Sequence, residues 1–272
     1  MDLPDFQFWL DHWRLTPDGE PFASTWSQLL PVRREGQALM LKACKAEQEV
    51  HGSAFLAGYS GLGAVRVLER QEDAVLLERA EGPRNLPNIA RAEGEDAAYA
   101  ILTKAIAALQ SAPGPFRVDP IPLETWFSIL PEASAFAGGV YARAEVVLHR
   151  LLATTQTEAP LHGDLHHGNL LDGGVRGWLA IDPKGLVGDP ACDYAIMLFP
   201  GDSPDVVAAP EVVNARIARV ASLAGLPPKR LAGWTFCVSA QYAGWFHGKP
   251  MGEAMMAVAL GLAADDEALA GI

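Results

Sequence analysis

Three residues within positions 161–185 combine useful chemistry with suggestive spacing: Asp164, Asn169 and Asp182. A hydroxyl that attacks the γ-phosphate of a nucleotide needs a carboxylate to orient it and accept its proton, and Asp164 suits that role. Mg²⁺ prefers oxygen ligands, so we expect the amide of Asn169 and the carboxylate of Asp182 to bind it. His162 lies two residues before Asp164, where its ring can hold the loop by bonding to backbone carbonyls. We therefore expect His162 to have a structural role.

The segments around these residues predict how they are brought together. Residues 172–177 contain Asp-Gly and Gly-Gly pairs between two apolar runs, which is typical of a hairpin. The second run, residues 178–181, predicts a short strand that ends at Asp182. The stretch is therefore interpreted as a catalytic loop, a hairpin, and a strand that delivers a carboxylate.

The motif His-x-Asp-x-x-x-x-Asn followed by Ile-Asp resembles that of the aminoglycoside phosphotransferases and their kinase-like relatives. Gly163 and the run Asp-Pro-Lys at 182–184 stand where protein kinases have Arg and Asp-Phe-Gly, which favours the small-molecule branch. Residues 181–190, IDPKGLVGDP, are similar to the streptomycin 6-phosphotransferase and hydroxyurea-resistance kinase subgroup. This resemblance implies ATP, with GTP as an alternative, Mg²⁺, and phosphorylation of streptomycin at its 6-hydroxyl, which inactivates the antibiotic. It also implies that Asp193 bonds to the backbone of the catalytic loop.

The same resemblance implies an α+β, protein-kinase-like fold of two lobes. We expect an N-terminal lobe over residues 1–81, with a small antiparallel sheet, and a mostly helical C-terminal lobe over residues 82–272. In the N-terminal lobe, the apolar patterns predict a helix near Phe6 and Trp9, a hairpin of residues 26–32 and 37–41, a helix over 46–58, and strands over 64–68 and 74–78. In the C-terminal lobe, they predict a loop over 112–122, a short helical piece over 123–130, and a helix that starts near Gly188. The longer helices are predicted over 88–111, 134–154, 206–225, 229–248 and 251–270.

In a kinase-like fold, a lysine on an N-lobe strand contacts the nucleotide phosphates, and a glutamate on the next helix holds it. Lys42 ends the apolar strand 38–42 and is our candidate, with Lys45 as the alternative. Glu49 is the candidate partner, and Glu47 remains open. The structural alternatives are a solvated strand end for the lysine and an exposed carboxylate for either glutamate.

A glycine-rich loop over the phosphates is absent from the sequence. Ser24 and Thr25 occupy the corresponding stretch, and their hydroxyl or backbone groups are candidate donors to phosphate oxygens. Adenine is expected to bond to main-chain groups around Glu78 and Ala80, where a strand gives way to a turn.

Composition limits the classes of function. The chain has 272 residues, half of them apolar, and no apolar run approaches the length of a membrane span. Its formal net charge of −12 argues against a nucleic-acid partner and suits a cationic small molecule. An acidic N-terminus and three scattered cysteines fit a cytoplasmic protein.

A cationic acceptor calls for carboxylates and aromatic surface. The candidates lie on the last two expected helices, and the acids are equally explained as a solvated acidic C-terminal helix. They are the acids Glu253, Asp265, Asp266 and Glu267 and the aromatic residues Trp234, Tyr242 and Trp245.

Four other interpretations stay open. His162, Asp164, His166 and His167 have residue types that bind transition metals, and Asp, Gly and Asn are also ordinary turn residues. A kinase of another aminoglycoside or hydroxylated metabolite would share the catalytic residues. A non-catalytic, kinase-like nucleotide-binding protein is the alternative from a different class.

Overall fold

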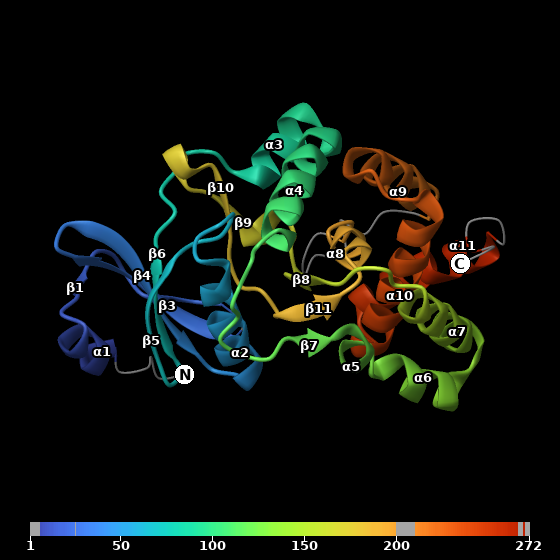
Figure 1. The fold of residues 1–272 in the computed structure, drawn as a ribbon, viewed down its shortest axis with the longest axis horizontal. Helices are drawn as coiled ribbons and strands as arrows, with labels where there is room; N and C mark the ends of the chain where they lie inside the picture. Colours follow the sequence, from blue (N-terminus) through green and yellow to red (C-terminus); the bar gives the residue numbers. More distant parts are fainter. Residues whose placement is uncertain (1–5, 25, 200–209, 266–268, 270–272) are drawn as a thin grey trace.

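The computed structural model describes residues 6–24, 26–199, 210–265 and 269. A sheet with two flanking helices forms one end of the molecule, and most of the helices form the other (Figure 1). Strand β6 ends at Glu78 and the next helix begins at Leu86, so the lobe boundary that we propose, between residues 81 and 82, falls in this connection.

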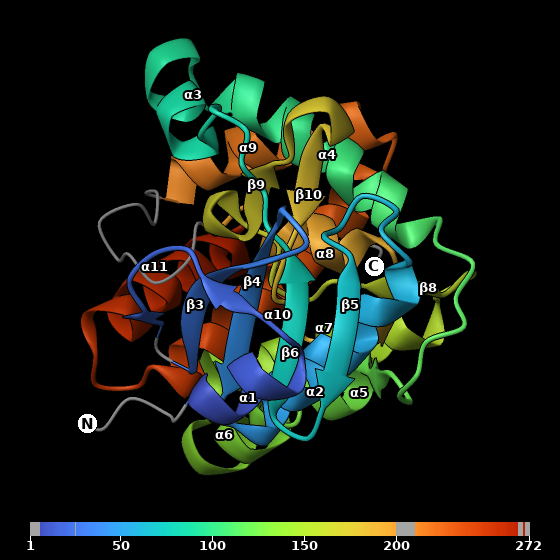
Figure 2. The same cartoon turned by 90° about the vertical axis from the view of Figure 1, so that its left-hand side faces the viewer.

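The N-terminal sheet is antiparallel, with strand order β1-β3-β4-β6-β5 and β2 paired to β3 (Figure 2). The predicted hairpin is confirmed as β3 and β4, whose register pairs Arg34 with Gln37. Strand β5 begins later than predicted, because the chain before it pairs with another hairpin. The N–H of Val65 donates to the oxygen of Ala180, and the N–H of Ala180 donates to the oxygen of Gly63. The strands are β1 (Thr16–Pro17), β2 (Phe22–Ala23), β3 (Ser27–Arg34), β4 (Gln37–Cys44), β5 (Val67–Gln71) and β6 (Ala74–Glu78).

Alternation along β4 determines which way its lysine faces. Leu39 and Leu41 pack with Trp9 of helix α1 (Phe6–His12) on one face of the sheet. Because successive strand residues point to opposite faces, Lys42 faces the other side. Helix α2 (Glu47–Leu56) lies on that side, and the Lys42 ammonium meets Glu49 there. The apolar pattern of one strand thus places a buried cation beneath α2.

The helical part departs from the prediction at two glycines. The segments expected to be single helices are each broken, at Gly94 and Gly138, whose φ angles are 94° and 60°. The helices are α3 (Leu86–Glu93), α4 (Glu95–Gln110), α5 (Leu123–Trp126), α6 (Ile129–Ala137), α7 (Gly139–Ala153), α8 (Ala191–Ile196), α9 (Pro210–Ala224), α10 (Pro228–Trp245) and α11 (Pro250–Ala264). None of the helices in the described part of the chain combines the length and apolarity needed to cross a bilayer.

Two small sheets hold the central stretch. The predicted hairpin is confirmed as β9 (Leu170–Asp172) and β10 (Trp178–Ala180). Strands β8 (Ala159–Leu161) and β11 (Leu186–Gly188) pair antiparallel, and β7 (Ile121–Pro122) adds to β11. The catalytic loop therefore begins at the end of β8, and the segment after β10 returns beside it.

Candidate active site

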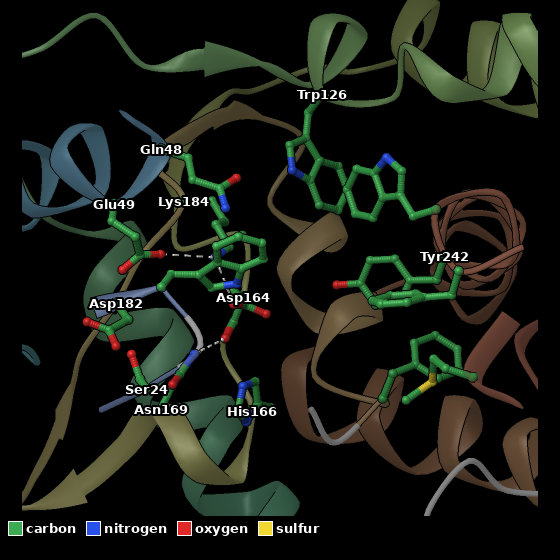
Figure 3. A pocket seen from close by; sticks show the side chains of 16 residues that line it. Ser24, Gln48, Glu49, Trp126, Asp164, His166, Asn169, Asp182, Lys184 and Tyr242 are labelled. Atoms are coloured by element: carbon green, nitrogen blue, oxygen red, sulfur yellow. Dashed lines mark hydrogen bonds and ion pairs between the residues drawn. The ribbon is translucent and has the colours of Figure 1, made fainter. Parts of the chain in front are cut away.

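Residues of both the sheet-bearing part and the helical part line a cavity of about 540 Å³. Asp164, Asn169 and Asp182 all line it, as the sequence predicted for residues that act together. Figure 3 shows Asp182, Glu49 and Ser24 toward one side and aromatic side chains on the other, with Asp164 between them.

His162 holds the loop that carries Asp164. Its ring is fully buried, with Nε2 2.8 Å from the backbone oxygen of Ile181, and Nδ1 accepts a hydrogen bond of 3.2 Å from the backbone N–H of Asp164. Burial lowers the pKa of His162 to about 3. The ring is therefore neutral near pH 7, with the proton on Nε2 and the lone pair on Nδ1, as the two hydrogen bonds require.

Asp193 holds the same loop from helix α8. Its carboxylate accepts hydrogen bonds from the backbone N–H groups of His162 and Gly163, at 2.9 and 2.8 Å. The side chain is completely buried, and burial raises the pKa of Asp193 to about 6 although these bonds oppose the shift. The contact expected from the family resemblance is present.

Asn169 joins the loop to the strand that follows. Its Nδ2 donates to the backbone oxygen of Asp164 at 2.9 Å, and its own backbone oxygen accepts from the N–H of Ile181 at 3.0 Å. The next residue, Asp182, has a φ of 56°, a left-handed conformation that is unfavourable for a residue with a Cβ. Such strain persists where the surroundings hold it and is frequent at functional sites.

A chain of alternating charges crosses the site. The ammonium of Lys42 lies 2.7 Å from both Glu49 and Asp182. The ammonium of Lys184 lies 3.7 Å from Glu49 and 3.3 Å from Asp164. Burial opposes the charged form of Lys42, but attraction to Asp182 and Glu49 outweighs burial and raises its pKa. Two lysines thus connect the three carboxylates that line the cavity.

These contacts identify the partner of Lys42, and burial distinguishes the two candidate lysines. Glu49 is the partner of Lys42, whereas Glu47 lies on the exposed face of the same helix. Lys45 is exposed, whereas Lys42 is 2% exposed.

Lys184 is the residue that our sequence reasoning did not assign. Besides its ion pairs, its backbone N–H donates to the oxygen of His162 at 2.7 Å, so it belongs to the same network as the catalytic loop. Its position in the sequence, two residues after Asp182, was the observation from which a role in the site could have been predicted. Lys184 lines the cavity itself, whereas Lys42 is buried and is not among the residues that line it.

The nucleotide-binding candidates are only partly brought to the cavity. Ser24 lines it from the turn between β2 and β3, where its hydroxyl oxygen accepts from the N–H of Ser27. Thr25 lies outside the described residues. Glu78 and Ala80 do not line the cavity, and the Glu78 carboxylate is engaged by Arg176 and by the N–H of Arg66.

The sequence comparisons agree with this geometry. Residues 12–249 match the family model for aminoglycoside/hydroxyurea antibiotic resistance kinases. The chain belongs to this kinase family. It is 38% identical over 246 residues to a streptomycin 3''-kinase from Klebsiella pneumoniae, covering 88% of this chain and 91% of that protein. It is 34% identical over 258 residues to a streptomycin 6-kinase from Streptomyces glaucescens, covering 87% of this chain and 80% of that protein.

The solved structures show the same fold at lower identity. A thermostable mutant of an aminoglycoside phosphotransferase, in ternary complex with ADP and hygromycin B, matches with a TM-score of 0.63 and 15% identity, covering 99% of this chain and 100% of that one. A choline kinase from Cryptosporidium parvum matches with a TM-score of 0.60 and 12% identity, covering 98% and 93%. The protein-kinase-like, two-lobed fold is confirmed, and the chain is a phosphotransferase with an alcohol group as acceptor.

The acidic substrate candidates of this kinase are not brought to the cavity. Glu253 is exposed in the first turn of α11, and neither it nor Asp265 lines the cavity. Asp266 and Glu267 lie outside the described residues. Acidic residues at the end of a helix face solvent by default, and nothing in the packing of α11 turns Glu253 inward.

The aromatic candidates divide between core and cavity. Trp234 is completely buried, and its indole N–H donates to Asp189 at 2.6 Å, so it is a core residue. Tyr242 and Trp245 line the cavity, together with Trp126, which we did not predict.

A transition-metal site is not formed by the histidines of the kinase motif. Both ring nitrogens of His162 are used within the loop, and His167 lies 3.2 Å from Glu95. Within residues 6–24, 26–199, 210–265 and 269, no group of three or more His, Cys, Asp or Glu side chains could hold a metal. The amide and carboxylate oxygens of Asn169 and Asp182 instead suit Mg²⁺, which keeps some waters and shares phosphate oxygens.

Proposed function

We propose that the chain transfers the γ-phosphoryl group of ATP to a hydroxyl of streptomycin and thereby confers resistance to the drug. The observation that carries this proposal is the convergence of Asp164, Asn169 and Asp182 on one cavity. Glu49 and Asp182, which line this cavity, both pair with the buried Lys42. The acceptor is proposed because relatives at 38% and 34% identity are streptomycin kinases. The reaction belongs in the cytoplasm, where ATP is available.

Asp164 is proposed to orient the acceptor hydroxyl and accept its proton. It lines the cavity on a loop that is held by His162 and Asp193. A carboxylate held this firmly can meet the hydroxyl without reorganisation, which is how a positioned base accelerates transfer. Lys42 is proposed to steady the nucleotide phosphates, with Glu49 holding its side chain.

Asn169 and Asp182 would hold Mg²⁺. When bound, the ion neutralises charge on the phosphate oxygens, which is where phosphoryl transfer needs stabilisation. Ser24 and Thr25 are proposed to cover the phosphates, and main-chain groups near Glu78 and Ala80 to bond to adenine.

The hydroxyl that is phosphorylated has two candidates. The motif at 181–190 favours the 6-hydroxyl, whereas the 38% identical relative is a 3''-kinase. Phosphorus-proton correlation NMR of the product distinguishes the two esters directly. We propose the 6-hydroxyl, and a 3''-phosphate would overturn that choice while leaving the enzyme class intact.

The test of the function is release of ADP by the purified full chain with streptomycin as acceptor, repeated with GTP. A panel of other aminoglycosides, hydroxyurea and small alcohols identifies any better acceptor. Expression in a sensitive host should raise the inhibitory concentration of streptomycin. Faster turnover with another acceptor and no gain in resistance would overturn the proposal.

A further inference from the structure

We infer that an aromatic wall, formed by Trp126, Tyr242 and Trp245, binds a guanidinium group of the acceptor. This inference rests on the proposed function, because it assigns the chemical feature by which the same cavity selects its substrate. Streptomycin carries guanidinium groups on one of its rings, so the wall would bind that end of the molecule while a hydroxyl faces Asp164.

The three rings form a continuous surface. Tyr242 and Trp245 lie on the last turns of α10 and stack, with ring centroids 5.4 Å apart and planes 28° from parallel. Trp126, at the end of α5, meets Trp245 edge to face, with centroids 5.2 Å apart and planes at 87°. Two helices that are far apart in the sequence thus supply one wall.

The wall faces the catalytic residues. All three rings line the cavity that contains Asp164, and Figure 3 shows Trp126 and Tyr242 across it from Glu49 and Asp182. Trp245 is 44% exposed although it is one of the largest apolar side chains. Exposed aromatic surface inside a concave site beside reactive groups is typical of a ligand-binding surface.

The distribution of charge favours a guanidinium over an ammonium. Among the described residues that line the cavity, the carboxylates are Glu49, Asp164 and Asp182. All three are engaged by Lys42 or Lys184 on the side opposite the wall. An ammonium is strongly hydrated and gains little from rings alone, whereas a guanidinium is planar, weakly hydrated and stacks on aromatic faces.

A neighbouring pair places a cation near an aromatic ring. The ammonium of Lys249 lies 5.9 Å from the ring centroid of Phe246, which also lines the cavity and meets Tyr242 edge to face. A cation thus lies within cation–π distance of a ring at the margin of the wall.

The test compares Trp245→Leu with Trp245→Phe, using the full chain. Isothermal titration calorimetry gives the Kd of streptomycin, and steady-state kinetics gives KM and kcat. We expect Trp245→Leu to raise Kd and KM for streptomycin about 10-fold, which is the size of a partly desolvated cation–π contact, and to change kcat less than about 2-fold. Trp245→Phe keeps a ring and should stay within about 3-fold of wild type.

Two controls make the result specific. Phe136→Leu removes an aromatic ring that is 95% exposed on α6 and does not line the cavity, and it should change nothing. An aminoglycoside whose cations are all ammonium groups should lose less affinity than streptomycin in Trp245→Leu. Circular dichroism melting confirms that each variant is folded.

The outcomes separate the subsite from the function. A Kd within 2-fold of wild type in Trp245→Leu, or no binding of streptomycin by wild type, would overturn the aromatic subsite. Equal losses for guanidinium and ammonium ligands would also overturn it. Turnover of streptomycin that is insensitive to Trp245→Leu removes the subsite and keeps the proposed function. Tight binding without phosphorylation, lost in Trp245→Leu, keeps the subsite and removes the proposed function.

Discussion

At the scale of single residues, the site is organised by charges that each have more than one partner. Glu49 is shared by Lys42 and Lys184, and each lysine also reaches a second carboxylate. Lys42 and Glu49 are buried, so removing either of them leaves its partner uncompensated, which is more damaging than the loss of one surface ion pair. The arrangement is therefore most sensitive to truncation of Lys42 or Glu49.

Lys184 provides the prediction at this scale. A lysine ammonium inside the cavity, 3.3 Å from Asp164, can turn toward phosphate oxygens when a nucleotide is bound. We expect Lys184→Met to lower kcat/KM for ATP about 10- to 100-fold, and Lys184→Arg to recover part of the loss. Lys45→Met, at an exposed position, is the control. Wild-type kinetics in Lys184→Met would show that this cation only fills space.

At the scale of elements, helix α2 is packed against the segment that carries Asp182 and Lys184. A Cβ at Gly52 would lie 2.1 Å from the backbone oxygen of Pro183, so only glycine permits this approach. The close packing sets the distance between Glu49 and both lysines. The position of a whole helix thus depends on one missing methyl group.

Gly52→Ala should therefore damage stability and activity together. A backbone oxygen cannot move aside as a flexible side chain can, so overpacking should cost about 1–3 kcal/mol, more than the gain in helix propensity. Displacement of Glu49 should also lower kcat. Denaturant unfolding and ADP release measure the two effects. Glu47→Ala, on the exposed face of the same helix, should change neither, and an unaltered Gly52→Ala enzyme would contradict the packing argument.

Helix α8 holds the catalytic loop through a buried carboxylate, and this has a defined pH dependence. The pKa of Asp193 is raised to about 6, so the native state retains a proton that the unfolded state has lost between about pH 4 and 6. This contribution falls as pH rises through that window. His162, with its pKa lowered to about 3, acts oppositely: its contribution is lost as pH falls below its unfolded value.

Asp193→Asn removes one of these two opposing effects. The stability of the variant relative to wild type should increase by roughly 2–3 kcal/mol between pH 4 and pH 7, because the variant has no buried charge to form. Urea unfolding at several pH values measures the difference. A difference that is constant with pH would show that Asp193 ionises in the native state as readily as in water.

At the scale of the whole molecule, the net charge of −12 should act on the encounter with a cationic acceptor. Long-range attraction is screened as the ionic strength rises from about 20 to 300 mM. We expect kcat/KM for streptomycin to fall several-fold over this range, with kcat little changed. ATP provides the comparison, since an acidic surface repels an anion, and screening should not lower kcat/KM for ATP as it does for streptomycin. A salt-independent kcat/KM for streptomycin would show that the net charge does not contribute to substrate capture.

The sequence predicted the parts of the site that are encoded locally. Asp164, Asn169 and Asp182 belong to one motif, and the alternation of β4 oriented Lys42. The ion pairs of Lys184 were not predictable, because its partners at 49 and 164 approach it only after the chain folds. The aromatic wall was not predictable for the same reason, since Trp126 and Trp245 lie on different helices that meet only after the chain folds.

The errors in the helical part have a local cause. Apolar residues recur at helical spacing on both sides of Gly94 and Gly138, so periodicity alone could not locate the breaks. The acidic residues near the C-terminus were chosen for their charge. Charge alone does not tell whether a helix turns a residue inward, and Glu253 faces solvent.

Our proposal is that Asp164 acts as the base and that Asn169 and Asp182 hold the metal in one cavity, with Lys42 paired to Asp182 and Glu49. It is tested most directly by Asp164→Asn, which keeps the size of the side chain and removes its ability to accept a proton. With ATP, Mg²⁺ and streptomycin, we expect kcat to fall at least about 100-fold while the Kd for ATP stays within about 3-fold of wild type. A variant that retains near-wild-type kcat would contradict the account, because the proton would then be accepted elsewhere.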